Sequence, residues 1–288
     1  MCEEAMLEKW AKQAISRRGL GMLGAAGALA ACTSMSGAGQ TSARVQGRRV
    51  SVQLVDGVND AYFTAPAEGR HPGVIIWPDV ASLRPVFIQM ADRLAAEGFA
   101  VLVMNPYYRD VRAPVWPDFA AFVADGGFQK VRPWRAKLTK DAIGQDTREA
   151  VAWLGAQDEV DSARGVGVEG YCMGGPFAVW SAAAVPARVK AAASFHGGGL
   201  VTDQPTSPHQ TFAQSEASYL IAISQDDDAQ APTHKTVLRE AADAAGRAAR
   251  VEVFRADHGW TVPDSPAFQR AEGERAYAML LELYRGAL

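Results

Sequence analysis

From about Arg48 to the C-terminus, short apolar runs alternate with segments of helical periodicity, and this alternation constrains the fold more than any other feature. Strands are predicted at residues 49–55, 73–77, 100–104, 165–169, 190–195, 219–223 and 250–254. Helices are predicted at 85–97, at 141–155, after Gly174, at about 233–246 and from about Pro266. Repeated β–α units imply an α/β fold in which a mainly parallel central sheet carries helices on both faces. The first strand alternates in polarity, which is typical of an edge or half-buried strand.

The length and charge of the chain fit one domain of this kind. Its 288 residues are 48% hydrophobic and 21% charged, which is an ordinary globular composition, and an α/β domain can use such a length without splitting. The formal net charge of −3 argues against nucleic-acid binding, which requires a basic excess. We therefore predict a single domain over residues 41–288, preceded at 1–40 by a leader and linker.

The first forty residues resemble an export signal. Arg17 and Arg18 precede a short stretch of Gly, Ala, Leu and Met, and a twin arginine favours the Tat route. The stretch ends Leu-Ala-Ala-Cys at 29–32, which resembles a lipoprotein lipobox, so a lipidated Cys32 would anchor the protein to a membrane. The alternatives are a plain signal peptide and an unprocessed amphipathic helix. We expect a periplasmic or membrane-anchored protein, or a cytoplasmic one if the leader is not used.

An irregular segment at about 105–140 interrupts the β–α alternation. It is rich in proline and aromatic residues, and a long excursion of this kind in a domain is often a lid or the wall of a binding site. On that reading Tyr107, Arg109 and Trp134 are candidates for the substrate pocket. The alternative is a small helical insertion that packs its aromatic side chains into a core of its own.

A nucleophile-elbow pattern lies between the strand at 165–169 and the following helix. The sequence Gly-Tyr-Cys-Met-Gly at 170–174 is the G-x-S-x-G pattern with cysteine in place of serine. The glycines allow a sharp turn that exposes Cys172 at the N-terminus of a helix, where a thiolate is favoured. The backbone N–H of Met173 can then donate to a developing oxyanion. The alternative is a small cysteine buried in a glycine-rich turn.

Candidate partners for the thiol follow two later strands, in the order nucleophile, acid, histidine that this pattern requires. The run Asp226–Asp228 comes after the strand at 219–223, and His258 comes after the strand at 250–254. Only one of the three aspartates can be the acid, and the run could also be a solvated turn. His196 ends a strand on the same sheet edge, so it could line the pocket. No spacing of histidines or cysteines indicates a metal site, and no cofactor is implied.

The chain resembles the dienelactone hydrolase family through G-Y-C-M-G-G at 170–175, D-x-x-x-P at 228–232, H-G-W at 258–260 and N-P-Y-Y-R at 105–109. The resemblance implies an α/β-hydrolase fold and selects Asp228 as the acid, four residues before the proline. It also implies that Asp79 contacts the resting cysteine and that the N–H of Val80 is the second oxyanion donor. Trp260, beside the histidine, becomes a further candidate for the pocket.

One departure from the family concerns substrate charge. Its best-known members bind an anionic lactone with an arginine four residues after the histidine, and this position is Val262 here. Arg109, Arg132 and Arg135 are possible substitutes.

The sequence as a whole predicts a hydrolase that cleaves a carboxylic ester or lactone through a triad of Cys172, His258 and Asp228. Its partner would be a small-molecule substrate. Two other functions remain open from the residues alone. One is acyl transfer or peptide-bond cleavage on the same triad, and the other is a degenerate hydrolase that serves as an envelope binding protein.

Overall fold

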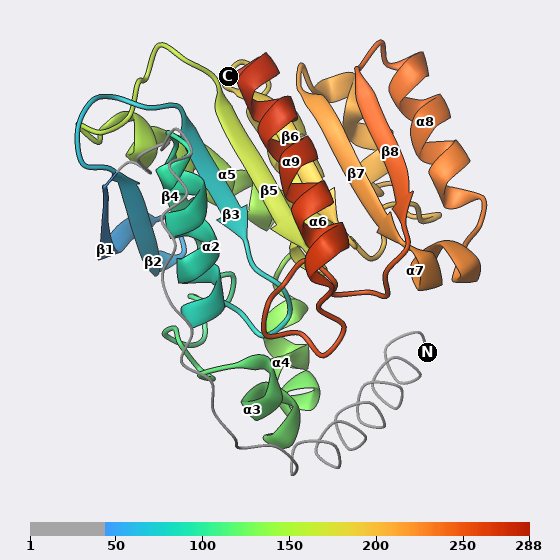
Figure 1. The fold of residues 1–288 in the computed structure, drawn as a ribbon, viewed down its shortest axis with the longest axis horizontal. Coiled ribbons are helices and arrows are strands. Elements are labelled where there is room, and N and C mark those ends of the chain that lie inside the picture. Colours follow the sequence, from blue (N-terminus) through green and yellow to red (C-terminus); the bar gives the residue numbers. More distant parts are fainter. Residues whose placement is uncertain (1–43) are drawn as a thin grey trace, which may run out of the picture. The chain divides into compact units, whose positions relative to one another are not determined.

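Eight strands form one sheet in the order β1-β2-β4-β3-β5-β6-β7-β8 in the computed structural model, which describes residues 44–288 (Figure 1). The pairs β1–β2 and β2–β4 are antiparallel and all other neighbours in this sheet are parallel. The strands are β1 (Val45–Leu54), β2 (Gly57–Pro66), β3 (Gly73–Trp77), β4 (Ala100–Val103), β5 (Val166–Tyr171), β6 (Val189–Phe195), β7 (Ser218–Ser224) and β8 (Ala249–Phe254). Each predicted strand is present, the mainly parallel sheet is confirmed, and β1 is an edge strand.

Helices cover both faces of this sheet, as predicted. Figure 1 shows α2 and α9 in front of the strands and α5 and α6 behind them. The helices are α2 (Pro85–Ala96), α3 (Phe119–Ala124), α4 (Gly127–Arg135), α5 (Lys140–Gly155), α6 (Gly174–Ala184), α7 (Gln225–Gln230), α8 (His234–Ala244) and α9 (Arg270–Ala287), with a 3₁₀ helix at Pro208–Gln214. None of the helices within 44–288 combines the length and the apolar composition needed to cross a membrane. The leader and Cys32 lie outside the described residues.

The strand β2, which forms a hairpin with β1, was not predicted from the sequence. Polar residues interrupt its apolar pattern, yet Asn59 is fully buried. Its side chain donates to the carbonyl of Asn105 at 2.9 Å and accepts from the Asn105 N–H at 3.0 Å. Because both polar ends are satisfied by the backbone that follows β4, this residue fits the interior of the sheet.

The segment at 105–140 contains α3 and α4 and a cluster of aromatic side chains. The ring centroids of Phe122 and Phe128 lie 4.6 Å apart, and those of Trp116 and Phe122 lie 4.9 Å apart. Trp134 packs against Trp116 and against Tyr107, with centroids 6.3 and 5.4 Å apart. The second interpretation of this segment, a helical insertion with its own aromatic core, therefore describes how these side chains pack.

A carboxyl group is buried in the sheet beneath α9. Glu169, on β5, is 2% exposed and accepts hydrogen bonds from the hydroxyls of Tyr171 and Tyr284, each at 3.0 Å. Burial raises the pKa of Glu169 to about 7, although the two hydroxyls act to lower it. The folded protein therefore holds this proton at a pH where the unfolded chain has released it.

We expect Glu169→Gln to stabilise the protein more at high pH than at low pH. The carboxyl titrates near 4.5 when exposed and near 7 when folded, so the free energy of unfolding falls as the pH rises through this range. An uncharged amide removes this loss and should raise the free energy of unfolding by about 3 kcal/mol at about pH 8. Urea unfolding at about pH 5 and pH 8 measures the difference, and an equal effect at both would contradict the prediction.

Candidate active site

Cys172 occupies a strained turn between β5 and α6. Its φ of 53° lies in the left-handed region, which a residue other than glycine rarely adopts. A Cβ at Gly170 would collide with the carbonyl oxygen of Gly174, and a Cβ at Gly174 would collide with that of Trp77. The glycines thus let two backbone segments meet closely under the turn. The thiol is free and partly exposed, so Cys172 is not a buried core cysteine.

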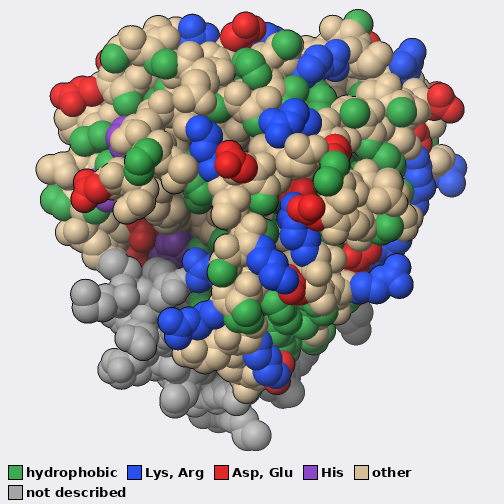
Figure 2. All heavy atoms as spheres, turned by 180° about the vertical axis from the view of Figure 1, so that it is seen from behind, with side chains coloured by type: hydrophobic (Ala, Val, Ile, Leu, Met, Phe, Trp, Pro, Cys, Tyr) green, Lys and Arg blue, Asp and Glu red, His purple; other side chains and the backbone are tan. Residues whose placement is uncertain are grey.

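His258 lies beside this thiol on the loop after β8. The Cys172 side chain lies close enough to His258 to raise the pKa of its imidazole, and His258 Nδ1 lies 2.8 Å from Asp227 Oδ2. Burial acts to lower the pKa of His258, but Cys172 and Asp227 outweigh it and hold the pKa well above 6.5. The face in Figure 2 is hollowed where histidine and acidic side chains come together. The geometry therefore brings a thiol and an imidazole close together and joins the imidazole to a carboxylate by a hydrogen bond.

The carboxylate in this series is Asp227, which corrects the sequence-based choice of Asp228. Asp228 instead accepts from Lys235 Nζ at 2.7 and 2.8 Å. Both aspartates lie on α7, and consecutive side chains of an α-helix are about 100° apart, so Asp228 is rotated away from His258. Asp226 has a third role, because its Oδ1 accepts the backbone N–H of His258 at 2.9 Å.

A capping signal in the sequence could have identified the acid. Ser224 precedes α7 and accepts the backbone N–H of Asp227 at 3.2 Å. The spacing Ser-x-x-Asp at 224–227 is typical of a helix N-terminus, and it predicts a helical turn across the three aspartates. The family resemblance selected Asp228 by counting four residues back from Pro232, and this count takes no account of the helical turn.

The two predicted oxyanion donors lie on segments that Tyr107 joins. Its hydroxyl donates to the carbonyl of Val80 at 2.9 Å and lies 3.2 Å from the sulfur of Met173. Tyr107 is 1% exposed, so it does not form an open wall of the pocket as predicted. It instead holds the loop after β3 against the nucleophile elbow.

Asp79 does not take the role that the family resemblance implied. Its carboxylate pairs with Arg84 through two hydrogen bonds of 2.7 and 2.9 Å and also accepts the N–H of Ala81 at 2.9 Å. Within residues 44–288 no hydrogen bond joins Asp79 to Cys172. The short aspartate side chain is directed to the buried guanidinium instead of the thiol.

Arg84 connects three segments around the site. It is fully buried, and besides Asp79 it donates to both oxygens of Asp264, at 2.8 and 2.7 Å. Asp264 follows the His258 loop and also accepts the N–H of Phe119 at the start of α3. One guanidinium therefore holds the oxyanion loop and the histidine loop together, and through Asp264 it reaches the insertion.

We expect Arg84→Met to lower the free energy of unfolding by about 3–5 kcal/mol, because it leaves two largely buried carboxylates without their cation. Urea unfolding monitored by tryptophan fluorescence measures the change. Arg285→Met is the matched control, since Arg285 pairs with Glu97 while 61% exposed and should contribute less than about 1 kcal/mol. A similar effect of both substitutions would contradict the assignment.

His196 contacts the backbone of the nucleophile elbow and is buried, so it is not an exposed part of the pocket. It is 1% exposed, and its Nδ1 lies 3.1 Å from the backbone nitrogen of Cys172. A backbone N–H can only donate, so Nδ1 is unprotonated and Nε2 donates to Thr261 Oγ1 at 2.9 Å. Burial, together with the charge of His258, holds the pKa of His196 well below 6.5. The ring is therefore neutral.

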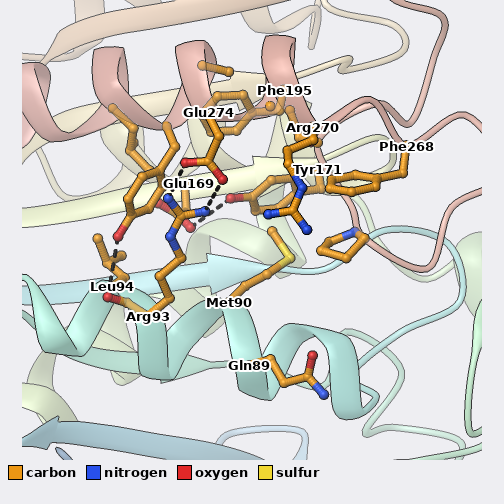
Figure 3. A pocket seen from close by; sticks show the side chains of 16 residues that line it. Gln89, Met90, Arg93, Leu94, Glu169, Tyr171, Phe195, Phe268, Arg270 and Glu274 are labelled. Carbon is orange, nitrogen blue, oxygen red and sulfur yellow. Dashed lines mark hydrogen bonds and ion pairs between the residues drawn. The ribbon is translucent and has the colours of Figure 1, made fainter. Parts of the chain in front are cut away.

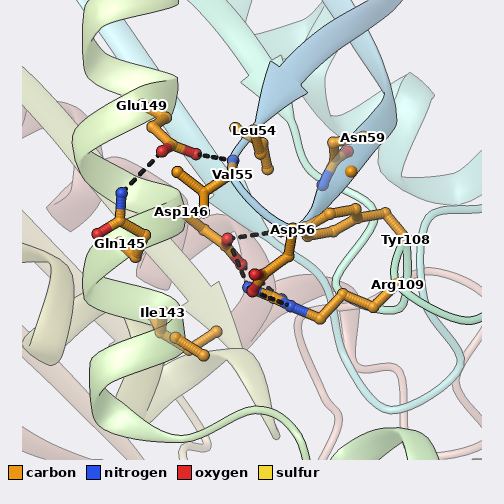
Figure 4. A network of polar contacts seen from close by, with 12 residues as sticks. Leu54, Val55, Asp56, Asn59, Tyr108, Arg109, Ile143, Gln145, Asp146 and Glu149 are labelled. Atoms are coloured by element: carbon orange, nitrogen blue, oxygen red, sulfur yellow. Dashed lines mark hydrogen bonds and ion pairs between the residues drawn. The ribbon is translucent and has the colours of Figure 1, made fainter.

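Trp260 and Arg109, two other candidates for the pocket, have structural roles. Trp260 is fully buried, stacks on Phe254 with centroids 5.1 Å apart, and meets the ring of His196 edge-on. Arg109 donates to both oxygens of Asp146 at 2.8 Å and to Asp56 at 2.8 Å, as Figure 4 shows. These pairs fasten α5 to the β1–β2 turn. The prediction that Arg109 binds substrate is therefore corrected, because its guanidinium is already engaged by two carboxylates.

Comparisons with known proteins bear on the family and fold of the chain. The model of the dienelactone hydrolase family matches residues 59–288. A Salmonella typhi protein provisionally named carboxymethylenebutenolidase is 22% identical over 230 residues, which cover 78% of this chain and 81% of that protein. A carboxymethylenebutenolidase from a Pseudomonas species is 30% identical over 121 residues, or 41% of this chain and 47% of that protein.

Solved structures show the same fold. A dienelactone hydrolase-like promiscuous phosphotriesterase from metagenomic libraries is 23% identical with a TM-score of 0.65, over 84% of this chain and 98% of that one. The dienelactone hydrolase of Anabaena variabilis is 17% identical with a TM-score of 0.62, over 85% and 99%. At these identities the structures establish the α/β-hydrolase fold alone, whereas the family model spans most of the chain. The chain belongs to the dienelactone hydrolase family.

Proposed function

We propose that this protein hydrolyses a carboxylic ester or lactone with Cys172 as nucleophile, His258 as general base and acid, and Asp227 as the residue that orients the histidine. The observation that carries the proposal is the juxtaposition of Cys172, at a nucleophile elbow, with His258, whose Nδ1 lies 2.8 Å from Asp227 Oδ2. Membership of a hydrolase family and relatives named carboxymethylenebutenolidase support the same reaction class.

The proposed reaction steps follow from which ring nitrogen of His258 carries a proton and which one can accept it. Nδ1 of His258 donates to Asp227, so Nε2 is the nitrogen that accepts the proton of the thiol. The sulfur attacks the ester carbonyl carbon, and the N–H groups of Val80 and Met173 stabilise the oxyanion. The alkoxide leaves with the proton from Nε2, which produces an acyl-enzyme on Cys172. Water then loses a proton to His258 as it attacks the thioester, and the free acid and the thiol result.

We propose further that the acyl part of the substrate carries no carboxylate. Val262, at the position where the family's best-known members have an arginine, is 1% exposed. Arg109 and Arg84 are each engaged by two carboxylates. A carboxylated lactone would therefore find no free cation at either of these positions. Arg132 and Arg135, the other two possible substitutes, lie on α4, and a carboxylate that they do not reach would lose its hydration without gaining a paired cation. A neutral ester or lactone has no such cost.

Alkylation with iodoacetamide tests the nucleophile. A variant in which Cys2 and Cys32 are serine leaves Cys172 as the remaining thiol of the chain. We expect hydrolysis of p-nitrophenyl acetate to fall in proportion to the carbamidomethylated fraction measured by intact mass. Hydrolysis that survives complete modification would refute the mechanism. A matched pair of lactones, with and without a carboxylate, tests the substrate, and faster turnover of the anionic lactone would contradict the second proposal.

We also propose that residues 1–40 export the protein and that Cys32 is lipidated. The support is the twin arginine followed by a short apolar stretch ending Leu-Ala-Ala-Cys. Fractionation of a bacterial host that has the Tat and lipoprotein pathways, with metabolic labelling by a palmitate analogue, tests this. Label on the natural chain and none on Cys32→Ser is the expected result, whereas an unprocessed cytosolic protein would exclude it.

A further inference from the structure

A cavity lies between α2 and α9, on the face of the sheet that carries Glu169 (Figure 3). It has a volume of about 230 Å³. Its wall is mainly apolar and aromatic, with Met90, Tyr171, Phe195, Phe268 and Tyr277 among the lining residues. Cys172, Asp227 and His258 do not line it, so this cavity is separate from the proposed catalytic site.

The volume limits the ligand to a small molecule. A cavity of about 150 Å³ lined by apolar side chains is large enough to bind benzene. The cavity here is therefore suited to one aromatic ring with a short substituent, or to an alkyl chain of similar bulk. Aromatic side chains on several sides favour such a flat apolar group.

The rim of the cavity carries more positive than negative charge, because it has two arginines, Arg93 and Arg270, and one glutamate, Glu274. Arg93 and Glu274 form a two-point ion pair, with distances of 3.0 and 2.5 Å, and so compensate each other. Arg270 also lines the cavity and helps to lower the pKa of nearby Glu274, but among the described residues no salt bridge engages it. It is the first residue of the 18-residue helix α9, where the helix dipole adds further positive potential. An anionic group at the rim would therefore be stabilised.

Glu169 also lines the cavity, but its carboxyl group does not prevent an anion from binding at the rim. Both of its oxygens accept hydrogen bonds from tyrosine hydroxyls. Its pKa of about 7 means that the group is substantially protonated near neutral pH. A ligand that keeps its anionic end at Arg270 places only its apolar part near this carboxyl.

We propose that this cavity binds a small amphipathic monocarboxylate, with its ring or short chain among the aromatic side chains and its carboxylate on Arg270. Such a ligand contacts Tyr171 and Phe195, which immediately precede Cys172 and His196 in the chain. The site goes beyond the proposed hydrolase function, because binding here does not require the thiol to react.

Calorimetric titration with benzoate tests the proposal, on the full chain after iodoacetamide has blocked Cys172. We expect a dissociation constant on the order of 1 mM, and much weaker binding of the uncharged benzyl alcohol. Arg270→Gln should weaken benzoate binding about fivefold, as expected for loss of an exposed ion pair. Arg285→Gln is the matched control, because it removes the same charge from the same helix outside the cavity, and it should have no effect.

Met90→Trp should abolish binding by filling the cavity. Because a larger side chain could disturb folding, the exposed Arg270 variant provides the independent test. No binding of benzoate, equal binding of benzyl alcohol, or equal loss in the two arginine variants would each overturn the proposal. A benzoate site that disappears on alkylation of Cys172 would place the ligand in the catalytic site and would also overturn it. None of these results bears on whether Cys172 is the nucleophile.

Discussion

Replacing Cys172 with alanine should lower kcat/KM for p-nitrophenyl acetate at least about 10³-fold, because no acyl-enzyme can form without the sulfur. The expected loss is large because the remaining groups have no nucleophile to activate. Steady-state hydrolysis, corrected for the uncatalysed reaction at the same pH, measures it. An alanine variant that retains more than about a tenth of the activity would show that hydrolysis takes place elsewhere or without covalent catalysis.

The fold should survive this substitution, which makes the result interpretable. Alanine has a Cβ like cysteine, so the cost of the left-handed conformation at φ 53° is the same in both proteins. The thiol is partly exposed, and its removal leaves no large buried void. We expect the midpoint of urea unfolding to change little. Cys172→Ser provides a second control, since its hydroxyl is harder to ionise and should restore only a small part of the activity.

Local patterns in the sequence predicted much of the fold and the centre of the site. Hydrophobic runs located the inner strands because β3 to β7 are largely buried on both faces. The glycines at 170 and 174 located the elbow because a side chain there would collide with backbone. His258 followed from the position of the last strand. These features depend on residues close in sequence, which a pattern can capture. The hairpin strand β2 was missed because Asn59 is buried, and its partner Asn105 lies 46 residues away.

Pairing between distant charged residues could not be predicted in the same way. Arg84 meets Asp264 across 180 residues, and Arg109 meets Asp146 across 37. Nothing in a single sequence indicates which carboxylate a given arginine will reach, because the pairing depends on how loops at one sheet edge converge. Arg109 could therefore be taken for a substrate-binding residue when its guanidinium in fact joins two parts of the scaffold.

The choice between two neighbouring carboxylates can be tested with a matched pair of variants. Asp227→Asn should lower kcat about 10²–10⁴-fold, since an amide hydrogen directed at Nδ1 of His258 favours the tautomer that protonates Nε2 and leaves no base for the thiol. Asp228→Asn makes the same chemical change one position along α7 and removes only the partly exposed ion pair with Lys235. It should alter kcat less than about threefold and stability by less than about 1 kcal/mol.

The two variants test which criterion identifies the catalytic acid. The geometry of α7 selects Asp227, whereas the D-x-x-x-P spacing selects Asp228. The Nδ1–Oδ2 distance of 2.8 Å belongs to Asp227, and Asp228 faces Lys235 on the other side of the helical turn. A large loss in Asp228→Asn with an active Asp227→Asn would mean that the spacing to Pro232 identifies the acid after all and that α7 turns on substrate binding. Comparable losses in both would mean that the pair supports His258 jointly. A loss confined to Asp227→Asn, with KM nearly unchanged, would assign this carboxylate to the chemical step because orientation of the imidazole matters only once the thiol begins to transfer its proton.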